Sequence, residues 1–191
     1  LCPMASVGID HGNALFRFPD GHRESHPITS NYRVEHALRD FLSRFSVEGD
    51  YCNYCGLYGY TSFNAVRYFE EIPIKDSREP KNDAPDMLYI LYRYLIIFND
   101  FRNEMMLLEM LSLGEEEHLD YLQRAIHNRN FTAYDFKAVG PVTSPLSDEE
   151  HKANIRKGIA HCLRGDVFQI VLSRRFVQQF QGDDFKLYRA L

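Results

Sequence analysis

The chain has 191 residues, of which 45% are hydrophobic and 26% charged, and its formal net charge at pH 7 is -5. This length and composition are typical of a globular protein with a buried core and one or two domains. The negative charge gives no electrostatic reason to expect nucleic acid or an anionic membrane as a partner. No apolar run approaches the roughly 20 residues of a membrane-spanning helix.

The N-terminal stretch predicts a small antiparallel meander. Its β-like pieces lie at residues 7–9, 14–18 and 23–28. Glycine-containing turn sequences separate these pieces. Asp10, His11 and His22 lie near the turns, where solvated side chains are far commoner than metal ligands, so we interpret them as turn residues.

A helix is predicted after the meander. Apolar residues recur there at the spacing of an amphipathic helix: Val34, Ala37, Leu38, Phe41, Leu42 and Phe45. Ser30 or Asn31 is suited to cap the start of this helix, and Gly49 marks the loop after its end. The pattern predicts a surface helix that packs one face on a core.

Cys52 and Cys55 have the C-x-x-C spacing found in zinc and redox sites. A structural zinc site needs two further ligands, and the sequence has no second close pair of Cys or His residues. A thioredoxin-like pair begins a helix, whereas Cys55 leads into the β-like residues 56–60. We interpret both cysteines as small, partly buried thiols. Four cysteines without regular spacing favour a reducing compartment, and we expect a cytoplasmic protein.

The middle of the chain predicts a short helix, a loop and a β-hairpin. The helix covers residues 62–71, the charged loop 75–85, and the two strands of the hairpin 87–98 and 104–111. The first strand is almost continuously apolar or aromatic, which is typical of a strand at the centre of a sheet. Its tyrosines, Tyr89, Tyr92 and Tyr94, favour packing over ligand binding.

A second helix is predicted where Leu119, Leu122 and Ile126 follow an acidic start and precede a basic end. Residues 131–145 contain Gly140-Pro141 and Ser144-Pro145, and we predict an irregular stretch there. We place a domain boundary near residue 142, which divides the chain into domains 1–142 and 143–191.

The C-terminal part predicts a helix followed by a strand. Ser147 and Glu150 form a capping-box signature, and Gly165 is suited to end the helix in the left-handed conformation. The residues that follow are predicted as a strand, 167–180, and along 167–176 Phe168, Ile170 and other apolar side chains share one face. Arg174 interrupts that apolar face.

The other face of this strand mixes apolar residues with Gln169, Ser173 and Arg175. For Gln169, one interpretation is a hydrogen bond to neighbouring backbone inside a sheet, since buried polar groups are normally paired. The second interpretation is a functional role. The sequence around Gln169 helps to decide between these two interpretations.

Residues 165–176 are here called the signature segment, and their sequence is Gly165-Asp166-Val167-Phe168-Gln169-Ile170-Val171-Leu172-Ser173-Arg174-Arg175-Phe176. This segment resembles the start of the chorismate-binding domain of anthranilate synthase component I. Shorter matches to the N-terminal domain of the same family lie at residues 18–21, 56–60, 66–70 and 97–100. The resemblance covers nearly the whole chain. It implies an α+β fold rich in antiparallel β-sheet, with peripheral helices, and a truncated chain. Residues 1–142 would be the N-terminal domain, and 143–191 the first helix and strand of the catalytic domain.

The resemblance also implies an activity. Enzymes of this family convert chorismate and ammonia to anthranilate and pyruvate in tryptophan biosynthesis. Mg²⁺ assists the leaving group, and a glutamine amidotransferase subunit (component II) supplies ammonia. The metal-binding glutamates, the catalytic histidine and the remaining substrate-binding residues would lie beyond residue 191. We therefore expect no metal ligand in this chain and no activity of this fragment alone. A tryptophan feedback site would also involve residues outside it.

Gln169 matches the position at which related isochorismate and salicylate synthases carry a lysine that activates water. A glutamine cannot take a proton from water at neutral pH, so the resemblance implies ammonia as the nucleophile. Two alternatives stay open: aminodeoxychorismate synthase, which leads to para-aminobenzoate, and a non-catalytic binding module. Apolar side chains and strand edges without neighbours also predict that the fragment self-associates.

Overall fold

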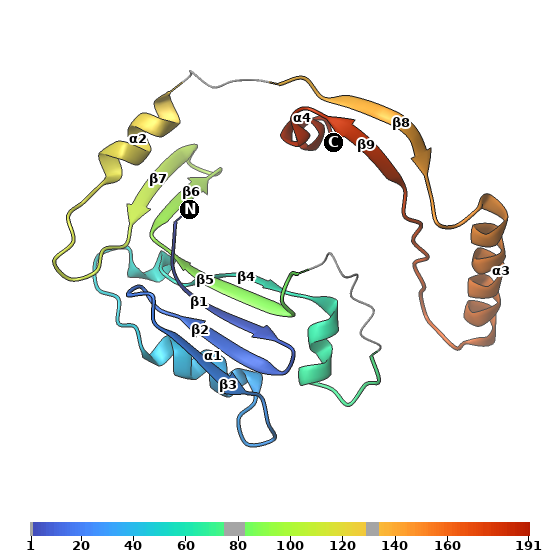
Figure 1. Cartoon of the computed structure of the whole chain (residues 1–191), viewed down its shortest axis with the longest axis horizontal. Helices are drawn as coiled ribbons and strands as arrows, with labels where there is room; N and C mark the ends of the chain where they lie inside the picture. Colours follow the sequence, from blue (N-terminus) through green and yellow to red (C-terminus); the bar gives the residue numbers. More distant parts are fainter. Residues whose placement is uncertain (1, 75–82, 129–133) are drawn as a thin grey trace. The chain divides into compact units, whose positions relative to one another are not determined.

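The computed structural model describes residues 2–74, 83–128 and 134–191 (Figure 1). The chain forms two compact units, Leu1–His127 and Asn128–Leu191, which are described separately. The predicted boundary near residue 142 lies inside strand β8 (Lys137–Thr143), which pairs with a strand of the second unit.

A five-stranded antiparallel sheet forms the centre of the first unit, with strand order β3-β2-β1-β5-β4. Its strands are β1 (Pro3–Asp10), β2 (Asn13–Arg17), β3 (Arg23–Pro27), β4 (Leu57–Thr61) and β5 (Met87–Tyr92). The first three strands confirm the predicted meander. Strand β1 lies between β2 and β5, so both of its edges are paired, and Val7 and Ile9 are fully buried.

Helix α1 (Val34–Ser43) packs on this sheet through most of the predicted apolar face, whereas Leu42, predicted on that face, is exposed. Phe41 is fully buried, and its ring centroid lies 5.2 Å from that of Phe16 on β2. Arg33 occupies the N-cap position of the helix, and its backbone N–H donates to Nδ1 of His36 at 3.2 Å. The prediction of Ser30 or Asn31 as the cap is therefore wrong, although the helix itself is confirmed.

The predicted strand 87–98 is split at Arg93 into β5 and β6 (Tyr94–Asn99). Strand β6 pairs with β7 (Glu104–Glu109), which confirms the predicted hairpin, and among the described residues the two form a sheet of their own. The backbone N–H of Arg93 donates to Cys2 at 2.9 Å, and its carbonyl accepts from Met110 at 2.7 Å. Arg93 is thus the residue at which the chain leaves one ladder of backbone hydrogen bonds and enters the next.

The other elements of the first unit are helical. They are the 3₁₀ helices η1 (Cys52–Tyr54) and η2 (Phe63–Tyr68) and the α-helix α2 (Leu119–His127). Helices η2 and α2 lie where the sequence predicts helices. Most of the predicted loop 75–85 lies outside the described residues.

The second unit contains β8, α3 (Asp148–Arg164), β9 (Val177–Gln181) and α4 (Asp184–Ala190). The irregular stretch predicted at 131–145 is wrong for residues 137–143, which form β8. The register with β9 shifts between Val139 and Thr143, and Gly140 has a positive φ of 75°. A bulge of this kind accommodates Gly140-Pro141 within a strand. Residues 131–133 lie outside the described residues.

Residues 167–176 of the predicted strand 167–180 form no strand, and only its last residues, from Val177 on, lie in β9. Within the described residues no strand pairs with this segment, and β9 begins only at Val177. A strand needs a hydrogen-bonded neighbour, so side-chain alternation alone does not make one.

Phe41→Ala should destabilise the chain by about 3–5 kcal/mol, because it leaves a cavity between α1 and the sheet. The neighbouring Leu42 is 49% exposed and provides a matched control. Leu42→Ala should cost less than about 1 kcal/mol. Urea denaturation followed by circular dichroism would measure both values. Equal losses would contradict the placement of the core.

Candidate functional site

The signature segment lies in the second unit, directly after α3. The predicted start of this helix is confirmed: the backbone N–H of Glu150 donates to Ser147 Oγ at 3.3 Å, and the N–H of Ser147 donates to Glu150 Oε2 at 2.8 Å. Hydrogen bonds from the Ser147 backbone and hydroxyl hold the pKa of Glu150 below its ordinary value. The predicted end is also confirmed, since Gly165 follows the helix with φ of 78°.

Asp166 fixes the first turn of the signature segment. Its Oδ2 accepts hydrogen bonds from Arg164 Nη2 at 2.7 Å and lies 2.8 Å from His161 Nδ1. Both contacts lower the pKa of the Asp166 carboxyl, with Arg164 the larger cause. The backbone N–H of Asp166 also donates to the carbonyl of His161 at 3.0 Å. The chain is therefore turned sharply as it leaves α3.

Figure 1 shows the segment running back along α3 before it enters β9. The segment lies against Gly158, the buried residue of α3. A Cβ atom at Gly158 would lie 3.1 Å from Cδ1 of Leu172 and 3.6 Å from Cγ2 of Ile170. Glycine inside a helix costs roughly 0.5–1 kcal/mol relative to alanine. Here the missing side chain makes room for the two apolar residues of the segment.

Arg174 holds the other end of the segment. Its guanidinium donates from Nε to Ser144 Oγ at 3.0 Å, from Nη1 to Asp148 Oδ1 at 2.6 Å and from Nη2 to the Leu146 carbonyl at 2.7 Å. It also lies 4.7 Å above the ring centroid of Phe176. This fork of donors joins the segment to the loop that leads into α3, as the planar shape of arginine allows.

Gln169, the predicted site residue, lies in the middle of the segment and is exposed. It does not pair with backbone inside a sheet, because residues 167–176 form no strand. The neighbouring Ile170 and Leu172 contact the side of α3 at Gly158. In the sequence pattern, Arg174 stands out only as an interruption of the apolar face. The sequence signal that could have identified its role is the group of acceptors at 144–148.

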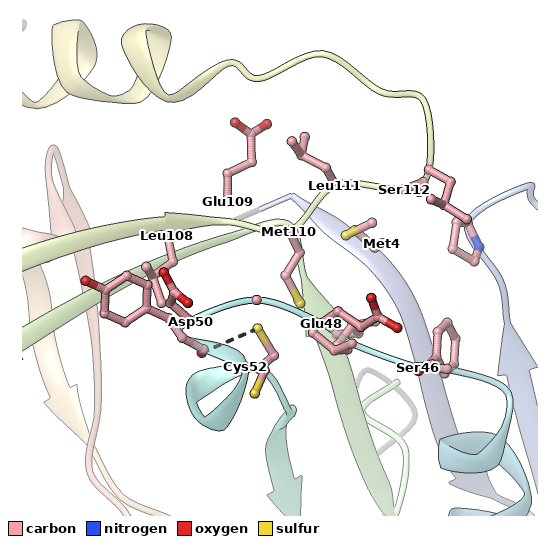
Figure 2. Close-up of a pocket in the computed structure, with 18 of the residues that line it drawn as sticks. Met4, Ser46, Glu48, Asp50, Cys52, Leu108, Glu109, Met110, Leu111 and Ser112 are labelled. Carbon is pink, nitrogen blue, oxygen red and sulfur yellow. Dashed lines mark hydrogen bonds between the residues drawn. The ribbon is translucent and has the colours of Figure 1, made fainter.

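A cavity of about 550 Å³ in the first unit lies beside the end of β7 (Figure 2). Sulfur-containing side chains line it: Met4, Cys52, Cys55 and Met110. Figure 2 shows Met110 directed toward Cys52, whereas Glu109 points to the opposite side of the strand. Burial, and then the nearby Cys52 thiol, raise the pKa of Cys55, so this thiol is a weaker nucleophile at neutral pH.

Glu109 forms a charged cluster on the other side of β7. Its side chain is only 1% exposed, and Oε1 lies 2.9 Å from Nε of Arg93. The backbone N–H of His118 donates to Oε2 at 2.7 Å. Burial alone would raise the pKa of Glu109, but the hydrogen bonds from His118, Arg93 and Tyr94 outweigh it and lower the pKa. These contacts join the start of α2 to the sheet, which is a structural role.

The polar residues near the N-terminal turns make ordinary pairwise contacts. His11 Nε2 lies 3.8 Å from Asp10 Oδ2, and His22 Nε2 lies 3.5 Å from Glu24 Oε1. Within residues 2–74, 83–128 and 134–191, no group of three or more His, Cys, Asp or Glu side chains is arranged to bind a metal. The residues described therefore do not fit a Mg²⁺ site.

The three tyrosines of the predicted central strand, Tyr89, Tyr92 and Tyr94, lie in two different surroundings. Tyr89 Oη lies 2.7 Å from Thr61 Oγ1 across β5 and β4, as expected for a packing residue with a satisfied hydroxyl. Tyr92 and Tyr94 instead line a groove beside β6, together with Tyr54 and Tyr58.

No helix in the described parts of the chain is long and apolar enough to cross a membrane.

Comparison with protein families matches residues 11–191 to the family described as chorismate binding enzyme. The chain is 30% identical to anthranilate synthase alpha subunit 1, chloroplastic, of Arabidopsis thaliana, over 72% of the chain and 27% of that relative. It is 31% identical to anthranilate synthase component 1 of Acinetobacter calcoaceticus, over 81% of the chain and 34% of that relative. The chain thus spans about a third of the relatives it matches.

Among solved structures, anthranilate synthase component I from Streptococcus pneumoniae TIGR4 superposes with a TM-score of 0.63. The match covers 100% of this chain and 43% of that one, at 18% sequence identity, and so concerns the fold. The architecture is an α+β fold with antiparallel sheets, which confirms the predicted fold class. The chain belongs to the chorismate binding enzyme family. Within that family it is similar to anthranilate synthase component I, as the signature segment predicts.

Arg174→Met should raise the pKa of Asp148 toward the ordinary value, because the Arg174 hydrogen bond and charge lower it. A carboxyl whose pKa is lowered by folding stabilises the fold above its unfolded pKa, and this contribution is lost as pH falls through the folded value. Carboxyl carbon-13 NMR titration would measure the pKa. Arg156→Met on α3 is the control and should leave Asp148 unchanged. An unchanged pKa in Arg174→Met would refute the ion pair.

Proposed function

We propose that this chain is part of an anthranilate synthase component I, which converts chorismate and ammonia to anthranilate and pyruvate. The observation that supports this proposal is the signature segment, with an exposed glutamine at position 169 on a segment held at both ends. The names of the relatives also support the anthranilate branch over aminodeoxychorismate synthesis. The non-catalytic binding module is disfavoured because family membership extends over most of the chain.

The side chain of Gln169 carries the chemical argument. Its amide both donates and accepts hydrogen bonds, but it cannot remove a proton from water at neutral pH. A lysine at this position would supply a base for water once its ammonium is deprotonated. With glutamine, ammonia has the advantage, because neutral ammonia is nucleophilic without prior deprotonation, whereas water needs a base. We therefore propose that Gln169 favours ammonia over water by withholding a base.

The proposal includes a partner and a metal. Two of the relatives are named as component 1 and alpha subunit, and we propose a glutamine amidotransferase subunit (component II) as the source of ammonia. Mg²⁺ would be held by residues of the longer enzyme outside this chain, since the described residues offer no suitable cluster. We place the enzyme in the cytoplasm. The four cysteines are free thiols, which suits a reducing compartment.

The longer enzyme should form anthranilate when it is given chorismate, Mg²⁺ and ammonium, and anthranilate fluorescence would follow the product. Gln169→Lys should lower the rate of anthranilate formation by about tenfold or more, because it replaces the amide with an ammonium and introduces a potential base for water. Chromatography of the reaction would reveal hydroxylated product in that variant.

Gln178→Lys provides a control with the same chemical change, because Gln178 lies in β9 and donates to the carbonyl of Val139 at 2.8 Å. Its loss should affect stability rather than the choice of nucleophile. Consumption of chorismate without anthranilate would shift the assignment to aminodeoxychorismate synthesis. An enzyme that consumes no chorismate under any of these conditions would overturn the proposal.

The isolated chain should self-associate. Phe168 and Val171 are 102% and 80% exposed, and the backbone of their segment pairs with no strand of the described residues. Such segments tend to pair between molecules. Light scattering after size-exclusion chromatography should show a mass that rises with concentration, and Val171→Lys should reduce it. A monomer at all concentrations would count against intermolecular pairing.

A further inference from the structure

We propose that the cavity beside the end of β7 binds a soft monovalent metal ion, copper(I), through the sulfur atoms of Cys52, Cys55 and Met110. Met4 contributes a further thioether to the wall of the same cavity. The four residues come from three separate parts of the first unit, namely β1, the turn of η1 and the end of β7. This inference does not depend on the function proposed above.

The two thiols are brought together by the turn of η1. Cys52 opens this 3₁₀ helix and Cys55 ends it, and the backbone N–H of Cys55 donates to the carbonyl of Cys52 at 3.0 Å. Side chains three residues apart lie on the same side of a 3₁₀ turn. Strand β4 follows at once and pairs with β5 from Leu57 on, so the turn is attached to the central sheet. Two thiolates at this spacing can chelate one metal ion.

The thioethers reach the cavity from other strands. Met4 lies where the register of β1 against β5 shifts, and a bulge of this kind redirects a side chain. The backbone N–H of Met110 donates to the carbonyl of Arg93 at 2.7 Å, which fixes the chain at the end of β7. Figure 2 shows the side chain of Met110 directed toward Cys52. The sheet itself therefore places a thioether opposite the pair of thiols.

The accessibility of the sulfur residues separates them from the methionine of the core. Methionine often only fills gaps between apolar side chains, and Met87, which is 3% exposed, does so here. Met110 packs against the core with part of its side chain, but it is not fully buried, and neither is Met4. Cys52 is exposed. An ion can therefore reach the sulfur atoms from solvent.

The mixture of thiols and thioethers indicates which ion fits. Thiolate and thioether ligands select soft ions such as copper(I), whereas zinc is completed by Cys, His or carboxylate ligands. Glu48 and Asp50 also line the cavity. Nevertheless, no three Cys, His, Asp or Glu side chains are grouped as metal ligands in the parts of the chain that the structure describes. The sequence argument against a metal counted only Cys and His, and the fold adds the methionines.

The test titrates copper(I) into the 191-residue chain under anaerobic conditions, in competition with bathocuproine disulfonate. Cys2→Ser and Cys162→Ser, combined in one variant, remove the two cysteines that lie outside the cavity. This variant should bind one copper(I) per chain, and X-ray absorption should show the copper surrounded by sulfur. Zinc(II), titrated in the same way, should not reach one ion per chain. Cys52→Ser in this background should abolish the site.

Met110→Leu in the same background tests the thioether. Since even the partners of metal ligands change affinity by about tenfold or more, the loss of this ligand should weaken copper(I) binding at least that much. Met105→Leu is the matched control, because Met105 lies on β7 and is 46% exposed. It should leave the affinity unchanged, and circular dichroism should show that both variants are folded.

Three results would overturn the proposal. The first is the absence of a one-to-one copper(I) site when Cys52 and Cys55 are the only cysteines. The second is equal affinity in folded Met110→Leu and Met105→Leu, which would mean that the thiols bind without the thioether. The third is copper coordinated by nitrogen or oxygen, or a zinc(II) site of one ion per chain, either of which would contradict the choice of a soft ion.

Discussion

An extended segment without a neighbouring strand must be held in place by side-chain contacts. This constraint governs the second unit. The signature segment is extended, yet residues 167–176 join no sheet among the described parts of the chain. A glycine turn at Gly165 directs the segment back along α3, and the gap at Gly158 receives it. Side chains supply the order that a ladder of hydrogen bonds supplies elsewhere.

The first unit meets the same constraint at Arg93, with a different solution. There the chain changes from one sheet to the next, and the backbone of a single residue hydrogen-bonds to both Cys2 and Met110. Its side chain then pairs with the buried Glu109. A buried charge is costly unless it is paired, so Arg93 and Glu109 require each other. In both units an arginine stands where regular pairing ends.

Local sequence signals predicted the elements whose causes are local. Ser147, Glu150 and Gly165 define α3 through interactions within a few residues, and the spacing around Phe41 defines α1 through its buried face. The proposal for Gln169 rests on a motif and stays a prediction. Non-local features were missed: an apolar run has no periodicity that marks the change of partner at Arg93, and alternation in 167–176 does not reveal whether a partner strand is present.

Two predictions, at Gly140-Pro141 and at Arg174, were incomplete for the same physical reason. The structure that a residue adopts depends on the groups that lie opposite it, and these are distant in the sequence. Gly140-Pro141 signals a break, yet a bulge opposite β9 accommodates both residues in β8. Arg174 interrupts an apolar face, yet Ser144, Leu146 and Asp148 supply acceptors from distant sequence. An arginine on an otherwise apolar face needs acceptors, since a buried guanidinium without them would cost several kcal/mol. An arginine that interrupts an apolar face in a sequence therefore indicates that hydrogen-bond acceptors lie nearby in the fold. Applied to the signature segment, this requirement leads from Arg174 to Ser144, Leu146 and Asp148 at the start of α3.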